Sequence, residues 1–315
     1  MKSSSSGQKV STLTKLKEAA LLLRAARRRK HLSAERLFGE FDCNIRQYAE
    51  LFTKYTGRDI GTAKIVEVGF GARPYRLATY HAKNLNATGI DLDMPVLDGT
   101  LGEFLRVIRN NGLERALKSI TRHYVADRIE QKKFMEYYRT GEFLNRRNMI
   151  IGSAAAPEIW QRLGTVDLVT SEDVVEHIPA DDLKTLVRLI ADHLADDGLA
   201  LIAPNVFTGI TGGHLLEWYH DAIDQAGKIT DPWEHLRRDR VPVNTYLNRL
   251  TRADYRTLFS AHFEILEEIV RQPDLGRQWF TEDARRALSA WPEEELFSNQ
   301  VVFVLRKRAP GSAGA

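Results

Sequence analysis

Seven short apolar segments recur along the chain, and longer segments of helical or mixed character separate them. Short apolar runs of this kind are typical of buried parallel strands. Strands that alternate with helices form crossover units, so we expect an α/β fold with a mainly parallel sheet and helices on both of its faces. The predicted strands are residues 63–69, 87–91, 148–152, 166–171, 199–204, 263–270 and 300–305.

The size and composition of the chain are those of a folded globular protein. It has 315 residues, of which 43% are hydrophobic and 28% are charged, and its formal net charge is +3. A net charge this small does not require a nucleic acid or a membrane surface as a partner. The basic run at 27–30 has few aromatic neighbours, which is more typical of a solvated helix face than of an RNA site. We therefore do not expect a nucleic-acid partner.

The cysteine count and the hydropathy restrict the compartment and the kind of metal site. Cys43 is the single cysteine, which excludes an internal disulfide and a multi-cysteine zinc site. Residues 1–10 are Ser-rich without an apolar core, so we do not expect a signal peptide, and no apolar run is long enough to span a bilayer. We expect a cytoplasmic protein with no transmembrane segment and no metal centre. The oligomeric state cannot be read from the sequence.

Periodicity divides the chain into a helical N-terminal part and one α/β domain. Residues 11–57 have helical spacing with a break near His31, which predicts two helices ahead of the domain. The domain is predicted to extend over 58–308. The ends of the chain, 1–10 and 309–315, are predicted to be disordered tails.

Two stretches, 94–146 and 206–256, are too long for simple crossovers and are predicted to be helical insertions that cap a substrate site. In the second, Gly212 and Gly213 suggest a hinge for a lid. The aromatic cluster at 218–220 is suited to closing an apolar pocket over a substrate. Aromatic residues at this spacing are as often plain core, so both interpretations stay open.

The first predicted strand ends in a glycine turn, Glu67-Val68-Gly69-Phe70-Gly71. Glycines at 69 and 71 permit a sharp turn and let the backbone approach a ligand closely. The second strand ends in Asp91, whose carboxylate can accept hydrogen bonds from two ribose hydroxyls. Ligands of open α/β sheets bind beyond the carboxyl ends of the strands, so this pairing predicts an adenosine-type ligand.

A nicotinamide dinucleotide is the alternative ligand for such a turn. Its fingerprint, Gly-x-Gly-x-x-Gly, requires a third glycine where this chain has Pro74. Proline lacks the amide N–H that a pyrophosphate would bind. The turn therefore favours an adenosine ligand without phosphates, and a dehydrogenase is the weaker alternative.

Four segments, in this order and spacing, resemble the class I S-adenosylmethionine-dependent methyltransferases, especially the small-molecule group that includes the ubiquinone-pathway enzymes. The segments are residues 66–71, 89–92, 167–178 and 197–205. The resemblance covers 63–205 and also 263–306. It implies a Rossmann-like seven-stranded sheet, mostly parallel with an antiparallel last strand, and S-adenosyl-L-methionine as the cofactor.

The resemblance assigns residues at the ends of the first two strands. Glu67, Gly69 and Gly71 would line the methionine and ribose side of the cofactor. Asp91 would hold the ribose hydroxyls, and Leu92 would pack on the adenine.

Further assignments lie around these strands. Ser153 and Ala154 stand where the family often contacts the adenine amino group, although Ser153 carries no charge. Glu172 and Asp173 are expected near the sulfonium and ammonium groups of the cofactor, where negative charge is favourable. Arg73 replaces the third glycine of many relatives, and it would either crowd the methionine end or bind its carboxylate.

His177 and His214 are the catalytic candidates. His177 follows the fourth strand, beside the expected reaction centre, and the ordinary pKa of an imidazole suits a general base. The alternative interpretation is a histidine that caps or packs the short helix there. A base is needed only if the nucleophile is protonated, because the methyl group is already activated on a sulfonium.

The expected function is transfer of a methyl group from S-adenosylmethionine to an oxygen, nitrogen or carbon of a small organic or glycan-linked acceptor. A different class of function is a catalytically silent domain of the same fold that senses the cofactor or binds a partner. The residues Arg73 and Ser153, which depart from the family pattern, motivate this alternative.

Overall fold

The computed structural model describes residues 31–239 and 245–308. The first predicted N-terminal helix and both predicted tails lie outside these residues. The second predicted helix is α2, Ala34–Thr56, which begins after Ser33 and ends at Gly57 with a φ of 71°. The Ser33 hydroxyl accepts the Arg36 N–H, and the left-handed glycine ends the helix, as is usual at the two ends. No helix among the described residues is both long and apolar enough to cross a bilayer.

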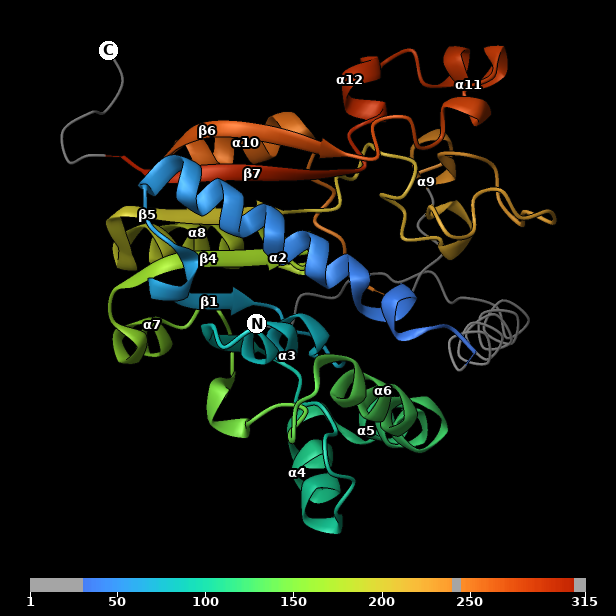
Figure 1. Ribbon diagram of the computed structural model, residues 1–315. Helices are drawn as coiled ribbons and strands as arrows, with labels where there is room; N and C mark the ends of the chain where they lie inside the picture. Colours follow the sequence, from blue (N-terminus) through green and yellow to red (C-terminus); the bar gives the residue numbers. More distant parts are fainter. Residues whose placement is uncertain (1–30, 240–244, 309–315) are drawn as a thin grey trace.

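The seven predicted strands form one sheet in the order β3-β2-β1-β4-β5-β7-β6 (Figure 1). β1 to β5 pair in parallel, and β7 runs antiparallel to both of its neighbours. This confirms the predicted Rossmann-like mixed sheet with an antiparallel last strand. The strands are β1 Lys64–Val68, β2 Asn86–Asp91, β3 Met149–Ile151, β4 Val166–Glu172, β5 Leu194–Ala203, β6 Phe263–Arg271 and β7 Gln300–Lys307.

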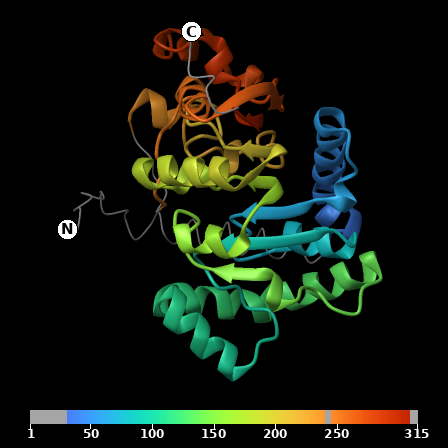
Figure 2. The same cartoon turned by 90° about the vertical axis from the view of Figure 1, so that its left-hand side faces the viewer.

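Helices cover both faces of the sheet (Figures 1 and 2). Since successive side chains of a strand point to opposite faces, each buried strand contributes to two apolar layers. In β7, Phe303 packs into the layer of α7, α8 and α10, whereas Val302 and Val304 pack into the layer of α2 and α3. These helices are α3 Tyr75–Ala82, α7 Pro157–Leu163, α8 Ala180–His193 and α10 Arg252–Ser260, and single 3-10 turns span Ile60–Thr62, Val175–His177 and Arg277–Trp279.

The strand order reverses between β1 and β4. The chain passes from β1 outward to β2 and β3, and then returns to place β4 on the other side of β1. The connections that leave the carboxyl ends of β1 and β4 therefore diverge toward opposite faces, which opens a crevice at this point. The glycine turn follows β1, and the segment with His177 follows β4, so both lie at the reversal point.

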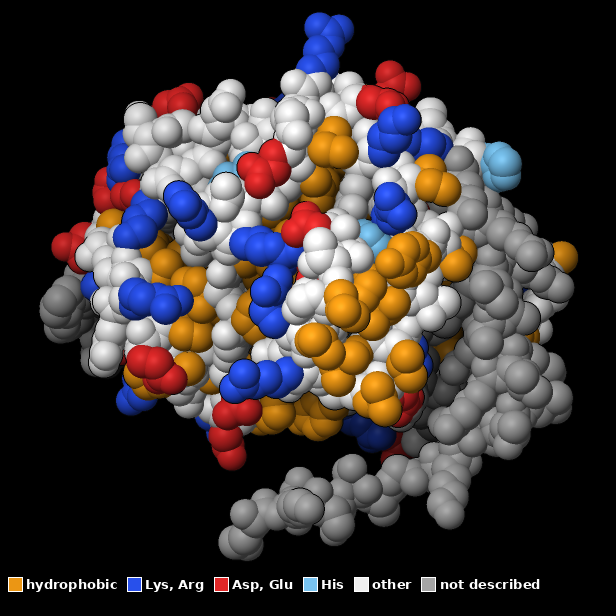
Figure 3. All heavy atoms as spheres, turned by 90° about the horizontal axis from the view of Figure 1, so that it is seen from below, with side chains coloured by type: hydrophobic (Ala, Val, Ile, Leu, Met, Phe, Trp, Pro, Cys, Tyr) orange, Lys and Arg blue, Asp and Glu red, His pale blue; other side chains and the backbone are white. Residues whose placement is uncertain are grey.

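The first insertion is a helical arm between β2 and β3. Gly112, with a φ of 79°, joins its first two helices, and the helices bury a small core around Val107 and Ala116. Leu101, Leu105 and Leu117 remain exposed. Figure 3, which views the molecule from below, shows apolar side chains gathered near Lys and Arg. The arm consists of α4 Leu101–Asn111, α5 Leu113–Arg122, a π-helical turn His123–Asp127, α6 Arg128–Tyr138 and a 3-10 turn Arg146–Asn148.

The second insertion is less helical than expected. Between β5 and α10 its described residues contain one 3-10 turn, Leu216–Trp218, and one short helix, α9 Glu234–Arg237. Its glycines explain part of the difference, because each glycine in a helix costs about 1 kcal/mol relative to alanine. The segment nevertheless buries Trp218 and Trp233 in a second core, shared with α11 Glu282–Ala287 and α12 Glu293–Leu296.

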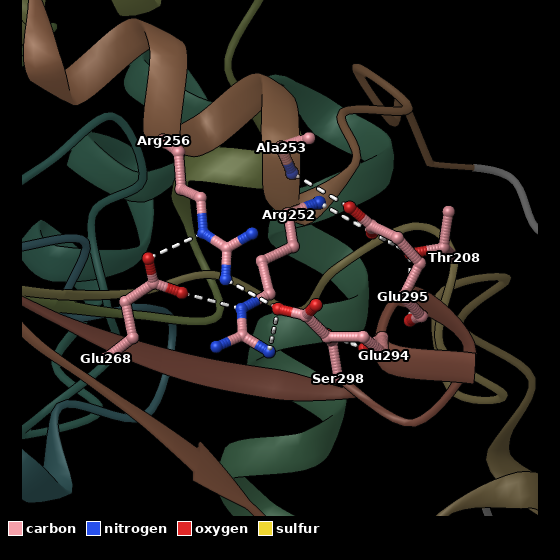
Figure 4. A network of polar contacts seen from close by, with 8 residues as sticks. All are labelled: Thr208, Arg252, Ala253, Arg256, Glu268, Glu294, Glu295 and Ser298. Atoms are coloured by element: carbon pink, nitrogen blue, oxygen red, sulfur yellow. Dashed lines mark hydrogen bonds and ion pairs between the residues drawn. The ribbon is translucent and has the colours of Figure 1, made fainter. Parts of the chain in front are cut away.

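A buried carboxylate fastens α12 to the start of α10 (Figure 4). Glu295 accepts the backbone N–H groups of Arg252 and Ala253, each at 2.9 Å. It also accepts the hydroxyl of Thr208 at 2.8 Å. The guanidinium groups of Arg252 and Arg256 pair with carboxylates of β6 and α12. Every oxygen of Glu295 thus has a donor, although the residue is buried.

Candidate functional site

The glycine turn after β1 has the conformation that its glycines were predicted to supply. Gly69 and Gly71 have φ values of 81° and 70°, in the left-handed region that favours glycine. A Cβ on Gly69 would lie 2.2 Å from a methyl carbon of Val174, which no side chain could tolerate. Around Gly71 a Cβ would meet nothing closer than 4.0 Å, so the backbone is accessible there.

Asp91 lies directly beside this turn. β1 and β2 pair in parallel with Val68 opposite Ile90, so the next residue of each strand enters the turn region together. The Asp91 Oδ2 accepts the Gly71 N–H at 2.7 Å, and its Oδ1 accepts the Asp93 N–H at 2.8 Å. Each oxygen keeps a second lone pair, so the oriented carboxylate can still accept two hydroxyl groups. Burial raises its pKa above the ordinary value of an aspartate.

Glu67 lies beneath the turn, near the end of β1, and is 1% exposed. Its Oε1 is 3.4 Å from Arg76 Nη1, while Oε2 has no hydrogen-bond partner among the described residues. Burial raises the pKa of this carboxyl to about 7, against the opposing effect of the Arg76 charge. A buried acceptor without a donor is a place where a ligand donor would be stabilising.

Glu172, the last residue of β4, is also buried, but positive groups surround it. Its Oε2 accepts from Arg76 Nη2 at 2.8 Å and from the Asn44 amide at 3.0 Å. Its Oε1 lies 2.9 Å from Arg271 Nη1. Burial raises the pKa to about 7, and the Arg271 charge opposes the rise. Glu172 thus joins α2, α3 and β6 behind the glycine turn. Its predicted role toward a sulfonium stays a prediction.

Asp173, the residue after β4, differs from Glu172 in exposure and conformation. Its side chain is exposed and its φ is 53°, a strained value for a residue other than glycine. Its Oδ1 accepts the Gln300 amide at 2.8 Å. Strain of this kind is more common at functional sites than elsewhere.

The residues predicted on the adenine side lie at the ends of β2 and β3. Leu92 is exposed directly after Asp91. Ser153 and Ala154 follow β3, which pairs with β2. The Ser153 hydroxyl accepts the Ala155 N–H at 3.2 Å, so it stabilises its own turn and remains able to donate one hydrogen bond.

Arg73 connects the glycine turn to the helical arm. Its Nε lies 2.9 Å from Asp127 Oδ1, and Arg122 Nε lies 2.8 Å from the other oxygen of the same carboxylate. Arg122 also donates to the Ala72 carbonyl at 3.1 Å. Asp127 belongs to the π-helical turn, a type of irregularity that is frequent at functional sites. No local pattern indicates this pairing, because 54 residues separate Arg73 from Asp127.

The two catalytic candidates lie together, and the structure adds a residue that the sequence reasoning missed. The imidazole rings of His177 and His214 are 4.8 Å apart between centroids. Glu176 Oε1 lies 3.8 Å from His214 Nε2, and the residue is 3% exposed. One ligand atom from each of the three residues lies within 4.8 Å of the others. An acid adjacent to a histidine at a strand end was the available sequence signal for Glu176.

The second insertion contributes His214 to the site, and the two glycines just before it, Gly212 and Gly213, are closely packed. A Cβ on Gly212 would lie 2.2 Å from the Phe207 carbonyl oxygen, and one on Gly213 would lie 2.7 Å from the His235 ring. These glycines are therefore required for close packing, and their predicted hinge role stays a prediction. Trp218 is buried in the second core, whereas the Tyr219 hydroxyl reaches His214 Nδ1 at 3.3 Å.

The residues that contact Glu172 were not predicted from the sequence. Asn44 and Arg271 reach Glu172 from elements far away in the chain. Arg76 could have been considered from its position, since it is in the first turn of the helix that follows the glycine turn.

Comparisons with known proteins point to one family. Residues 40–262 match the family described as "Methyltransferase domain". No curated protein matches the chain in sequence.

Several solved structures are similar in fold. A S-adenosylmethionine-dependent methyltransferase from Clostridium acetobutylicum ATCC 824 is 11% identical, with a TM-score of 0.43 over 93% of this chain and 98% of that chain. A TehB-like SAM-dependent methyltransferase from Corynebacterium glutamicum is 14% identical, with a TM-score of 0.37 over 82% and 86%. PKMT2 from Rickettsia typhi in complex with AdoHcy is 13% identical, with a TM-score of 0.41 over 82% and 52%. Because the family match spans most of the chain and agrees with the resemblance in the sequence, this protein belongs to the methyltransferase-domain family.

Proposed function

We propose that the protein binds S-adenosylmethionine at the carboxyl ends of β1 and β2 and transfers its methyl group to a small organic or glycan-linked acceptor. The observation that carries this proposal is the contact between Asp91 Oδ2 and the Gly71 N–H at 2.7 Å. It holds an acidic strand end against a glycine turn, which is the arrangement that a ribose requires.

The residues of the turn fit such a cofactor. Gly71 leaves its backbone accessible, and Asp91 keeps free lone pairs for two ribose hydroxyls. Glu67 adds a buried oxygen without a donor. The cofactor carries positive charge on its sulfonium and ammonium groups, and it supplies an activated methyl group. Carboxylates near the strand ends favour a cation over a phosphate.

Transfer of a methyl group from sulfur requires an acceptor atom in line with the breaking bond, so orientation and exclusion of water account for much of the rate. His177 and His214 follow β4 and β5 at the same edge of the sheet. They support an acceptor site on the β4 side of the glycine turn. His177 Nδ1 is 2.9 Å from the Tyr246 carbonyl, so in the neutral ring Nδ1 donates and Nε2 holds the lone pair. Nε2 can then accept a proton from the acceptor or bind a cation.

The test is isothermal titration with S-adenosylmethionine, comparing the wild type with Asp91→Ala. We expect the variant to lose at least about tenfold in affinity, because hydrogen bonds to a charged group contribute about 1.5–3 kcal/mol. Asp197→Ala is the matched control, since Asp197 is an aspartate of β5 near its amino end and pairs with Arg58. Absence of binding by the folded wild type, or unchanged affinity in Asp91→Ala, would overturn the proposal.

Acceptor chemistry can be approached with the same protein. Incubation with S-adenosylmethionine and pools of small phenols, amines and carboxylates, followed by mass spectrometry, should yield a product 14 Da heavier that is absent with Asp91→Ala. A folded protein that binds the cofactor but methylates nothing in such pools would favour the cofactor-sensing alternative.

A further inference from the structure

Glu176, His177 and His214 form a cluster whose polar atoms converge from two parts of the chain. Glu176 and His177 belong to the 3-10 turn after β4, and His214 belongs to the segment after β5. One ligand atom of each residue lies within 4.8 Å of those of the other two. Nothing in the proposed binding of S-adenosylmethionine to β1 and β2 requires these three groups to meet.

The carboxylate of Glu176 is poorly satisfied within the described protein. Neither of its oxygens makes a hydrogen bond of ordinary geometry to a described residue, and the residue is 3% exposed. The backbone N–H groups of Glu176 itself and of Asn205 approach it, and His214 Nε2 lies 3.8 Å away. Buried polar groups of native proteins almost always have a well-placed partner, so a buried carboxylate with contacts this weak calls for another.

His177 is held in the orientation and tautomer of a ligand. Its Nδ1 lies 2.9 Å from the Tyr246 carbonyl, which can only accept, so Nδ1 carries the proton. The lone pair is then on Nε2. A ligating histidine usually donates its other ring N–H to a carbonyl or a carboxylate in this way.

His214 approaches Glu176 with Nε2. Its Nδ1 is 3.3 Å from the Tyr219 hydroxyl, which accepts the Asn205 amide at 3.0 Å and can either donate to the ring or accept from it. When the ring binds a cation through Nε2, Nδ1 carries the proton and the Tyr219 oxygen accepts it. Its Nε2 has no hydrogen-bond partner in the described part of the chain and lies 3.8 Å from Glu176 Oε1. A neutral imidazole with a free lone pair on Nε2 is the form that binds metals.

We propose that Glu176, His177 and His214 bind a divalent transition-metal cation of the zinc type. Two imidazoles and one carboxylate are a set of three protein ligands found in catalytic zinc sites, and they leave a position for an exchangeable ligand. Tetrahedral zinc with bonds of about 2.0–2.2 Å needs donor atoms about 3.3–3.6 Å apart. The separation of 3.8 Å between Glu176 and His214 is already close to that range. Mg²⁺ prefers oxygen ligands, so it fits this set less well.

The site differs from the sequence-based expectation of no metal centre, which rested on the cysteine count. It also changes the expected part of His177 from a general base to a ligand. Metal binding itself does not depend on the proposed methyl transfer. If that function holds as well, the open position would receive an acceptor oxygen or nitrogen, and a bound cation would lower the pKa of an acceptor hydroxyl.

The experiment is a titration of the chelator-treated, tag-free protein with Co²⁺ and Zn²⁺ in the absence of S-adenosylmethionine. We expect one Co²⁺ per chain, with visible absorption bands that Zn²⁺ abolishes by displacement. Glu176→Gln and His214→Ala should each weaken Zn²⁺ binding at least about 100-fold, because even the loss of a group that only orients a ligand costs about 10–100-fold. His220→Ala is the matched control, since His220 is an exposed histidine of the same segment.

The outcomes separate this proposal from the cofactor proposal. Folded wild type that binds neither Co²⁺ nor Zn²⁺ overturns the metal site, and so does unchanged affinity in both Glu176→Gln and His214→Ala. Equal loss in His220→Ala would also overturn it. Circular dichroism reports folding. If His214→Ala does not fold, His177→Ala at the partly exposed position decides in the same way. Titration of S-adenosylmethionine into the wild type reports separately on the β1–β2 site.

Discussion

Two buried glutamates of this protein have opposite surroundings. Glu295 is 7% exposed and accepts two backbone N–H groups at the start of α10 as well as a hydroxyl group (Figure 4). Glu176 is 3% exposed and accepts no hydrogen bond of ordinary geometry from any described residue, although the backbone N–H groups of Glu176 and Asn205 approach it. The protein itself supplies hydrogen-bond donors to the carboxylate of Glu295, which indicates a structural role. The carboxylate of Glu176 lacks well-placed donors of this kind and would be satisfied by an external ligand, which indicates a binding site.

Of the substitutions that test this contrast, Glu295→Gln is expected to reduce the stability of the fold most. The amide keeps the shape of the carboxylate but turns an N–H group toward a donor of the α10 N-terminus, and it removes the charge that the helix dipole favours. We expect a loss of about 2–4 kcal/mol in the free energy of unfolding, measured by urea denaturation.

Glu294→Gln is the control for this change. Glu294 is the preceding residue of α12 and pairs with Arg252 and Arg256, but its side chain is 58% exposed. Exposed ion pairs contribute little to stability, so its loss should be clearly smaller. Equal losses in the two variants would contradict the assignment of Glu295 as a buried helix cap.

Much of the fold behind this comparison could be predicted from the sequence. All seven strands overlap the short apolar runs that predicted them, although β5 begins earlier, at Leu194. Burial on both faces leaves a local signature in the central strands. Gly69, Gly71 and Asp91 could be placed because a ligand turn and a strand end are also local features. The second insertion was harder, since its shape depends on packing around Trp218 and Trp233 and not on a helical period.

The surroundings of the carboxylates could not be predicted. Thr208 is 87 residues from Glu295, and Asn44 is 128 residues from Glu172. Tyr246 orients His177 through a backbone carbonyl, which any residue type would provide. Contacts of this kind depend on the positions of loops and helices in three dimensions, so no residue pattern along the chain announces them.

Glu67 is intermediate between Glu295 and Glu176 in the number of its partners, and its raised pKa predicts that the stability of the fold depends on pH. It has a distant donor in Arg76, faces the charge of Asp91, and leaves Oε2 without a partner in the described chain. Its folded-state pKa of about 7 is above the ordinary value of 4.5, so the folded protein holds a proton that the unfolded chain has released between these values. This stabilising contribution is fully present at pH 4.5 and below, and it decreases as the pH rises to 7.

Glu67→Gln removes that titration. Relative to the wild type, the variant should gain about 2–3 kcal/mol in unfolding free energy between pH 4.5 and pH 7.5, and little above that range. Urea denaturation at several pH values measures the difference curve. Glu172 and Asp91 titrate in both proteins and therefore cancel. A difference curve that is flat, or that falls with pH, would show that Glu67 is ionised in the folded state.

The smallest effect on stability is expected from Glu176→Gln in the metal-free protein. Comparing its unfolding free energy with that of Glu295→Gln tests the contrast between the two glutamates directly. Glu295→Gln breaks hydrogen bonds of good geometry, whereas Glu176→Gln breaks none of ordinary geometry among the described residues. Burial raises the pKa of Glu176 well above its ordinary value, so the change replaces one buried, poorly satisfied polar group with another of similar desolvation cost. We expect a change of less than about 1 kcal/mol in the free energy of unfolding, measured by urea denaturation in the presence of a chelator.

Saturating Zn²⁺ should then stabilise the wild type and leave Glu176→Gln nearly unchanged, because only a ligand that binds the folded state raises its stability. A loss in chelator as large as that of Glu295→Gln would mean that Glu176 has a structural partner, and the contrast between the two glutamates would then fail.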